Sequence, residues 1–189
     1  MTFSAVLLVG GESRRMGKDK ATIVVDGEPL WQRQLRVLKE LGPEKIFISA
    51  RVKPDWFPSD TELLLDEAPS RGPLSGLTKA LGRMQTTHLI ALAVDMPFIT
   101  GVEMKNLRDL VTAGAGVLPV IGDRAEPLAA IYPAEVLNDF ARALGGTDFS
   151  LQSLVRELAK SGKIELVAVE QERCDLYRSV NEPDDLPLL

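Results

Sequence analysis

Cysteine, histidine and aromatic residues are scarce in this 189-residue chain, and each scarcity excludes a kind of site. The one cysteine, Cys174, excludes an intramolecular disulfide and leaves too few thiols for a zinc cluster. The one histidine, His88, excludes a metal centre built on several imidazoles and would have to serve any Ser-His-Asp mechanism alone. Aromatic residues make up 5% of the chain, and Trp31, Trp56 and Phe57 are too scattered to form a stacking platform.

An excess of basic charge and long apolar runs are also missing. The chain has 22 Lys and Arg residues against 27 Asp and Glu residues, which gives a net charge of -5. Partners such as nucleic acids and anionic membranes require a broad basic surface, so we expect neither. No apolar run reaches the length of a membrane span, and no basic segment precedes the short apolar stretch at the start, as it would in a secretory signal. We therefore expect a cytoplasmic protein.

Short apolar runs alternate along the chain with longer segments of helical periodicity. The run at residues 88–94 is almost wholly apolar, which is typical of a strand covered on both faces. No linker-like stretch interrupts the pattern, so it predicts one α/β domain over residues 1–189, with three layers and a mostly parallel sheet. The expected strands lie at 3–9, 45–50, 62–65, 88–94, 117–120, 128–132 and 164–169, and the expected helices at 30–41, 72–84, 102–111, 133–144 and 150–159.

A glycine-rich, basic turn follows the first expected strand. It contains Gly10, Gly11 and Gly17, and four cations lie within residues 14–20. Glycines let backbone N–H groups approach an anion closely, and a local basic excess in an acidic chain points to a polyphosphate. The common phosphate-loop pattern does not match, because six residues separate Gly10 from Gly17 and five separate Gly11 from it. These residues alone also fit a solvent-exposed turn.

The segment GGESRRMGKDKA at residues 10–21 resembles the signature of the nucleotidyltransferase family that includes molybdenum cofactor guanylyltransferase, with Val9 before it as a departure. Later segments resemble other motifs of this family in the same order: Asp66 with RGPLSG at 71–76, AVDMPF at 93–98, EPLAAI at 126–131 and VNEPDDL at 180–186. The resemblance covers essentially the whole chain. It implies a Rossmann-like nucleotidyltransferase fold, with the nucleotide bound by about residues 1–100 and the acceptor by about residues 101–189.

The resemblance also implies a reaction. The family enzyme transfers GMP from GTP to the terminal phosphate of molybdopterin and releases pyrophosphate, with Mg²⁺ as cofactor. A phosphate nucleophile is already anionic, so catalysis requires positioning and charge neutralisation more than a strong general base. Further partners implied are other proteins of cofactor biosynthesis and the molybdoenzymes that receive the product.

Arg15, Lys20 and Asp95 match the family positions that carry the chemistry. The resemblance implies that Arg15 and Lys20 bind phosphate and neutralise charge in the transition state. It assigns the metal to Asp95, which follows a strongly apolar run, as suits a carboxylate exposed at the end of a strand. The alternatives are a surface lysine at position 20 and a helix-capping role for Asp95, although Thr100 is the better cap.

The remaining expected site residues divide between the two substrates. The acceptor is assigned to Pro127 and Asn181, although Asn181 is also compatible with a plain turn before Pro183. Ser49 is equally compatible with an ordinary strand position, and Gly72 and Gly76 with the turn that starts a helix. The nucleotide is assigned to Leu8, Val9, Gly10, Gly11, Lys20, Ser49, Asp66, Gly72, Gly76 and Asp95.

Two alternative functions remain open from the sequence. Gly10-Gly11 favours guanylyl transfer, because the related cytidylyltransferases and other small-molecule nucleotidyltransferases tend to have A-A-G or A-G-G there. A cytidylyltransferase for the same cofactor is therefore the nearest alternative. The other is a nucleotide-binding scaffold without turnover, against which the joint presence of Arg15, Lys20 and Asp95 argues.

Overall fold

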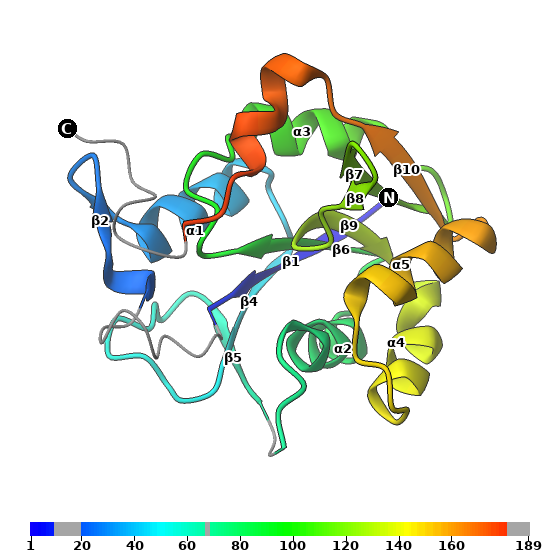
Figure 1. Ribbon diagram of the computed structural model, residues 1–189. Coiled ribbons are helices and arrows are strands. Elements are labelled where there is room, and N and C mark those ends of the chain that lie inside the picture. Colours follow the sequence, from blue (N-terminus) through cyan, green and yellow to red (C-terminus); the bar gives the residue numbers. More distant parts are fainter. Residues whose placement is uncertain (10–19, 67–68, 181–189) are drawn as a thin grey trace.

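A central sheet runs through the molecule, with helices on both of its faces (Figure 1). The structure is a computed structural model that describes residues 1–9, 20–66 and 69–180. The strands lie in the order β10-β7-β9-β6-β1-β4-β5, and β8 pairs with β7. Their bounds are β1 (Phe3–Leu8), β4 (Lys45–Ala50), β5 (Glu62–Leu65), β6 (His88–Ala93), β7 (Gly116–Ile121), β8 (Arg124–Ala125), β9 (Ala129–Pro133) and β10 (Ile164–Ala168).

The sheet is mostly parallel, as the sequence predicts. Strand β1 lies parallel to β4 and β6, β4 lies parallel to β5, and β10 lies parallel to β7. Strand β9 is the exception, because it is antiparallel to both of its neighbours, β6 and β7. The first residues of β9 therefore lie at the end of the sheet where β6 finishes.

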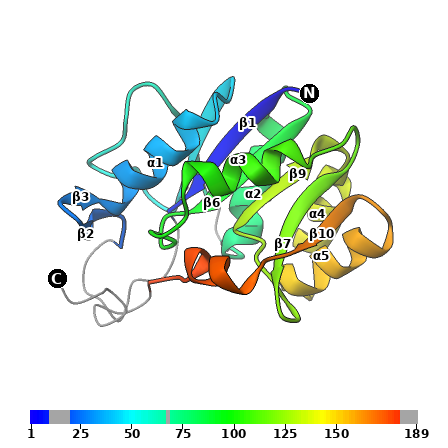
Figure 2. The ribbon, with the colours of Figure 1, turned by 90° about the horizontal axis from the view of Figure 1, so that it is seen from above.

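Two groups of helices cover the two faces of the sheet. Figure 2 shows α1 and α3 together on one face, with α2 and α4 behind the sheet. Each helix has an apolar face that packs on the strands, which is the usual reason for a layered arrangement. The helices are α1 (Leu30–Glu40) and α3 (Gly101–Asp109) on one face, and α2 (Pro73–Arg83), α4 (Leu137–Leu144) and α5 (Leu151–Lys160) on the other.

Buried apolar side chains form one core on each face, and the strand alternation divides them. In β6, Ile90 and Leu92 belong to the core under α1 and α3, whereas Leu89 and Ala91 belong to the core under α2, α4 and α5. All four side chains are fully buried. The nearly continuous apolar run at 88–94 is thus explained by a central strand with no solvent-exposed face.

Short elements at three places were not expected. A 3-10 turn, η1 (Lys20–Thr22), leads into a hairpin of β2 (Val24–Val25) and β3 (Glu28–Pro29), and α1 follows directly. A second 3-10 turn, η2 (Ala134–Val136), precedes α4, so the segment expected to be helical from residue 133 begins with the end of a strand. A third, η3 (Gln171–Tyr177), follows β10.

Side chains cap the starts of two helices, and the cap at Thr100 is expected from the sequence. Thr100 caps α3 by accepting a hydrogen bond from the backbone N–H of Glu103, and Ser150 caps α5 by accepting one from Ser153. None of the helices in the described ranges is long and apolar enough to cross a membrane. The strand directions and the helices on both faces of the sheet confirm the α/β fold class and the mostly parallel sheet.

Candidate active site

The carboxyl ends of β1, β4, β5 and β6 meet at one edge of the sheet. The register pairs Leu8 of β1 with Ser49 on one side and with Ala93 on the other. The ladder continues past Leu8, because the N–H of Val9 donates to the carbonyl of Ser49 and the carbonyl of Leu8 accepts from the N–H of Val94, both at 3.0 Å. Open α/β sheets bind ligands at this edge. Leu8, Val9 and Ser49 therefore lie where a nucleotide site is expected.

Asp95 and Lys20, two of the expected catalytic residues, lie together at this edge. The Nζ atom of Lys20 is 3.6 Å from Oδ2 of Asp95, and the two side chains are 19% and 25% exposed. Burial raises the pKa of Asp95, and the positive charge of Lys20 opposes that rise. The ionised carboxylate is therefore in an environment where a further cation would stabilise it. The structure thus brings two of the expected site residues together.

A second group of expected residues surrounds Asp66, which follows β5. Oγ of Ser49 lies 3.4 Å from one carboxylate oxygen of Asp66, and Oγ of Ser70 donates to the other at 2.9 Å. The same Ser70 oxygen accepts from the N–H of Gly72 at 3.2 Å. Gly72 has a φ of +63°, which favours glycine at this position before α2. Ser49, Asp66 and Gly72 are thus joined in one hydrogen-bond network, in which Ser70 links Asp66 to Gly72.

Gly76 brings α2 close to the end of β1. A Cβ atom at this position would lie 2.3 Å from Oγ of Ser49 and 2.9 Å from Cδ2 of Leu8. Contacts this short are essentially never seen for a real Cβ atom, so glycine lets the helix approach the two strands without a shift of Ser49, Leu8 or α2. Gly76 therefore has a packing role that the family resemblance alone did not indicate.

Pro127 lies at the same edge because β9 runs antiparallel to β6. The N–H of Ala93 donates to the carbonyl of Leu128 at 2.8 Å, which places the start of β9 beside the end of β6. The carbonyl of Pro127 accepts from the buried hydroxyl of Tyr132 at 2.7 Å. Pro127, which is expected to bind the acceptor substrate, thus lies at the same edge as Asp95, although it comes from the second half of the chain.

Glu126 is a residue of this edge that the sequence analysis did not assign to the site. Its side chain is 18% exposed, and burial raises the pKa of its carboxyl while Arg124 opposes the rise. A carboxylate directly before the proline of a substrate-side motif is the signal that could have identified it. The edge therefore carries the partly buried carboxyl group of Glu126 in addition to those of Asp95 and Asp66.

The chain segment after η3 returns to Asp95 and Lys20. The N–H of Val180 donates to the backbone carbonyl of Asp95 at 2.7 Å. The carbonyl of Val180 is 3.4 Å from Nζ of Lys20. Val180 thus contacts the backbone of Asp95 through its N–H and the side chain of Lys20 through its carbonyl. These two contacts place Val180 at the candidate site.

A buried carboxylate in α3 anchors this returning segment. Glu103 is 3% exposed, and its carboxylate accepts from the hydroxyl of Tyr177 at 2.6 Å and from the guanidinium of Arg173 at 3.0 Å. Burial, together with the hydrogen bond to Glu103, raises the pKa of the Tyr177 hydroxyl. None of these three residues could be predicted from the sequence, because a single glutamate in a helix and a tyrosine and an arginine some seventy positions away give no local signal.

Several expected residues lie outside the described part of the chain. These are Gly10, Gly11 and Arg15 of the glycine-rich turn and Asn181 near the end. Their assigned roles stay predictions.

The described residues fit a metal bound mainly by substrate. No group of three or more His, Cys, Asp or Glu side chains that could hold a metal occurs among them. Mg²⁺ in nucleotide enzymes commonly takes one or two protein carboxylates and completes its shell with phosphates and water. The carboxylate of Asp95 lies at the ligand-binding edge, and burial disfavours its ionised form, so it has the chemistry for this arrangement.

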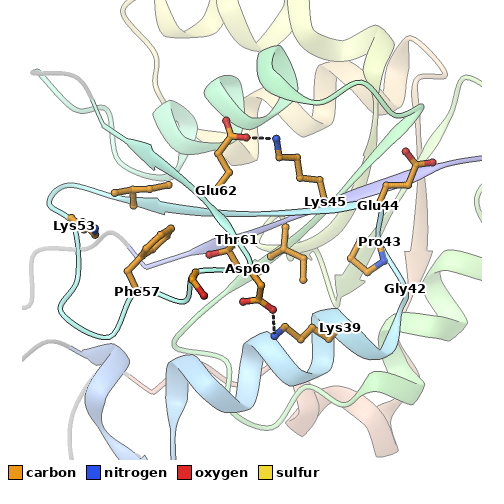
Figure 3. Close-up of a pocket in the computed structure, with 13 residues that line it drawn as sticks. Lys39, Gly42, Pro43, Glu44, Lys45, Lys53, Phe57, Asp60, Thr61 and Glu62 are labelled. Carbon is orange, nitrogen blue, oxygen red and sulfur yellow. Dashed lines mark hydrogen bonds and ion pairs between the residues drawn. The ribbon is translucent and has the colours of Figure 1, made fainter.

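The opposite end of the same strands has a different character. A hollow of about 830 Å³ lies between the start of β4, the start of β5 and the end of α1 (Figure 3). Lys39 pairs with Asp60 at 2.6 Å, and Lys45 pairs with Glu62, which also binds Arg83. Charges paired in this way offer little to a phosphate, so we do not place the nucleotide there.

His88 has a structural role, as expected of a histidine at the start of a strand. It is buried, with its ring nitrogens 2.9 Å from Oγ1 of Thr87 and 3.3 Å from the carbonyl of Ala115. Burial lowers the pKa of its imidazole. His88 therefore acts as a neutral core residue that joins β6 to the start of β7.

Comparison with known proteins agrees with this arrangement. The family model of the MobA-like NTP transferase domain matches residues 5–162. A probable molybdenum cofactor guanylyltransferase of Opitutus terrae is 37% identical over 96% of this chain and 92% of its own length. A molybdenum cofactor guanylyltransferase of Cereibacter sphaeroides is 31% identical, over 98% of this chain and 94% of its own.

A solved structure has the same fold. The crystal structure of molybdopterin-guanine dinucleotide biosynthesis protein A from Archaeoglobus fulgidus superposes with a TM-score of 0.77 at 22% identity, covering 96% of this chain and 94% of that one. The match of the family model, the full-length relatives and this shared fold lead to one conclusion: the chain belongs to the MobA-like NTP transferase family.

Proposed function

We propose that this protein is a molybdenum cofactor guanylyltransferase, which transfers GMP from GTP to the terminal phosphate of molybdopterin and releases pyrophosphate. The observation that supports it most is the Lys20–Asp95 pair at the carboxyl edge of the sheet, 3.6 Å apart. The nature of the two substrates follows from the full-length relatives that are named for this activity.

The geometry suits nucleotidyl transfer because the edge provides one cation and one carboxylate side by side. In the reaction the acceptor phosphate oxygen bonds to the α-phosphorus of GTP, and the bond from that phosphorus to the pyrophosphate oxygen breaks. The ammonium of Lys20 is placed to neutralise charge that develops on phosphate oxygens. Asp95 would hold Mg²⁺, which would screen the phosphates and orient the leaving group.

The neighbouring residues would bind the rest of the substrates. The turn around Asp66, Ser49 and Gly72 provides carboxylate and hydroxyl groups near the end of β4, where they would contact the nucleoside. Pro127 and the residues after Val180 border the edge from the second half of the chain and would face the acceptor. Residues from both halves of the chain thus border one edge, as a reaction between two substrates requires.

A nucleotide panel tests the base specificity of this proposal. GTP, CTP, ATP and UTP, each with Mg²⁺ at one concentration, would be compared by thermal shift. A ligand at one hundred times its Kd adds about 2.7 kcal/mol to stability, which is visible as a change in Tm. Selective stabilisation by GTP supports the proposal, and selective stabilisation by CTP identifies a cytidylyltransferase instead.

Turnover separates an enzyme from a scaffold. The chain would be incubated with GTP, Mg²⁺ and molybdopterin, and pyrophosphate release would be measured with and without the acceptor. Acceptor-dependent release is the expected result. Binding of GTP without any release would contradict the proposal and support a non-catalytic nucleotide-binding protein.

A further inference from the structure

Three consecutive backbone carbonyls after β6 accept hydrogen bonds from distant parts of the chain. The carbonyl of Asp95 accepts from the N–H of Val180 at 2.7 Å. The carbonyl of Met96 accepts from Nε2 of Gln34, and the carbonyl of Pro97 accepts from Nε of Arg33 at 2.8 Å. The segment that begins with Asp95 is therefore held by hydrogen bonds from other parts of the chain. Two of the three donors, Gln34 and Arg33, are adjacent side chains of α1.

Gln34 is an unusual residue for the face of α1 that packs on the sheet. It is 0% exposed, and its neighbours in this face, such as Leu35 and Leu38, are apolar. Its Oε1 atom has no hydrogen-bond partner among the described residues. A buried acceptor without a partner destabilises the folded state, and an apolar side chain of similar size would avoid that cost. The contact with Met96 is the one advantage that Gln34 has over such a side chain.

Arg33 extends the same attachment to the other side of the candidate site. Besides its contact with Pro97, it pairs through Nη1 with Oδ2 of Asp26 at 3.3 Å, in the turn between β2 and β3. That hairpin directly follows η1, which contains Lys20. The first turns of α1 thus contact both the loop of Asp95 and the hairpin that leads from Lys20.

Backbone hydrogen bonds complete this connection to Lys20. The N–H of Ile23 donates to the carbonyl of Lys20 at 3.1 Å, and the N–H of Leu30, the first residue of α1, donates to the carbonyl of Ile23 at 2.8 Å. Helix α1 therefore fixes the chain at Lys20 through its first residue and the chain at Asp95 through its side chains.

We propose that Gln34 and Arg33 are positioning residues that set the distance between Asp95 and Lys20. This inference rests on the proposed function, since it concerns the same ion pair. Both residues act through the backbone that carries Asp95, by their hydrogen bonds to the carbonyls of Met96 and Pro97. A displaced reacting group slows a reaction strongly even when the fold is intact, because alignment accounts for much of the rate.

The test replaces Gln34 by methionine, which keeps the length of the side chain and removes both the Nε2 donor and the Oε1 acceptor of its amide. We expect kcat for pyrophosphate release to fall by about 10- to 100-fold, with little change in KM for GTP. Affinity for Mn²⁺, titrated with GTP present and followed by electron paramagnetic resonance, should fall as well. The Tm should stay equal or rise, because the unpaired Oε1 is removed together with the donor. Gln32→Met, at an exposed position of the same helix, is the matched control and should change none of these values.

A second variant keeps the inference testable if Gln34→Met does not fold. Arg33→Lys preserves the charge at a partly exposed position but loses the directed Nε donor, and it should lower kcat and Mn²⁺ affinity less than Gln34→Met does. Wild-type kcat and Mn²⁺ affinity in a folded Gln34→Met, or in Arg33→Lys where Gln34→Met does not fold, would overturn the inference. A loss of kcat that follows Tm alone and leaves Mn²⁺ affinity unchanged would overturn it too. If Asp95→Asn itself turned over normally, the proposed role of Asp95 would fail instead, so the two failures are distinguishable.

Discussion

The two ends of strands β4, β5 and β6 handle charge in opposite ways. At the amino ends, Glu62 binds Lys45 and Arg83 and Asp60 binds Lys39, and these contacts lower the pKa of both carboxyl groups. At the carboxyl end, Asp95 has Lys20 at 3.6 Å, and burial still raises its pKa. The fold thus pairs its charges where they face solvent and leaves a carboxylate only partly compensated where we place the substrates.

This difference identifies the functional edge more clearly than the size of a hollow does. The hollow of about 830 Å³ lies at the amino ends, where charges are already paired. A smaller one of about 430 Å³ borders Asp66 at the carboxyl ends. Perturbed carboxyl groups at a ligand-binding edge are typical of functional sites, whereas exposed ion pairs contribute little beyond solubility. Changes at the two ends should therefore have effects of different size and kind.

The largest expected effect is that of Asp95→Asn, which removes the charge and keeps the shape. Pyrophosphate release should fall by about 10²- to 10³-fold, because the carboxylate that would hold the metal is lost. Since the folded state raises the pKa of Asp95, its favourable contribution to stability is present below the unfolded pKa and lost as pH rises. The neutral variant should therefore keep or raise its Tm at neutral pH. Normal turnover in this variant would contradict the metal-ligand assignment.

Gly76→Ala should have the next largest effect, because it disturbs packing at the same edge of the sheet. The new Cβ would lie 2.3 Å from Oγ of Ser49 and 2.9 Å from Cδ2 of Leu8, so these side chains or α2 itself must shift. We expect a loss of about 2–3 kcal/mol in unfolding free energy and weaker binding of GTP. Gly82→Ala in the same helix is the control, because its Cβ would meet Cδ1 of Leu137 at an ordinary 3.8 Å. That variant should gain about 0.5–1 kcal/mol, so a loss of equal size in both would refute the packing argument.

Tyr177→Phe tests the anchor of the returning segment. Glu103 would keep Arg173 but lose the hydroxyl at 2.6 Å, which should cost about 1.5–3 kcal/mol in chemical denaturation. Tyr132→Phe is a matched comparison, because its buried hydroxyl donates to the neutral carbonyl of Pro127. It should cost about 1 kcal/mol. A smaller loss at Tyr177 than at Tyr132 would show that the charged acceptor adds nothing.

The smallest effect is expected at the amino ends, from Glu62→Gln. The ion pairs with Lys45 and Arg83 are exposed enough to be screened, so the loss should be at most about 1 kcal/mol and should shrink with added salt. The pKa of Glu62 is lowered in the folded state, so its contribution is present above the unfolded pKa and lost as pH falls. The difference between variant and wild type should therefore vanish in acid. Any loss of pyrophosphate release would break the contrast between the two ends.

Much of the fold could be predicted because its signals are local. The apolar run at 88–94, the periodic segment at 30–41 and the caps at Thr100 and Ser150 each depend on residues within a few positions. The strand ends that carry Asp66 and Asp95 were predictable for the same reason. The antiparallel direction of β9 was not, because an apolar strand gives no sign of the direction in which it will pair.

The sequence by itself determined the α/β class, the positions of most helices and strands, and the motif residues that place this chain in its family. Only the tertiary structure decided that β9 brings Pro127 to the edge of Asp95, that Glu103 anchors the segment ending at Val180, and that Gln34 binds the carbonyl of Met96. The physical reason is the distance along the chain between the residues that interact. Helix and strand periodicity comes from neighbours along the chain, whereas these contacts join residues tens of positions apart and form only when the sheet and its two helical layers have packed.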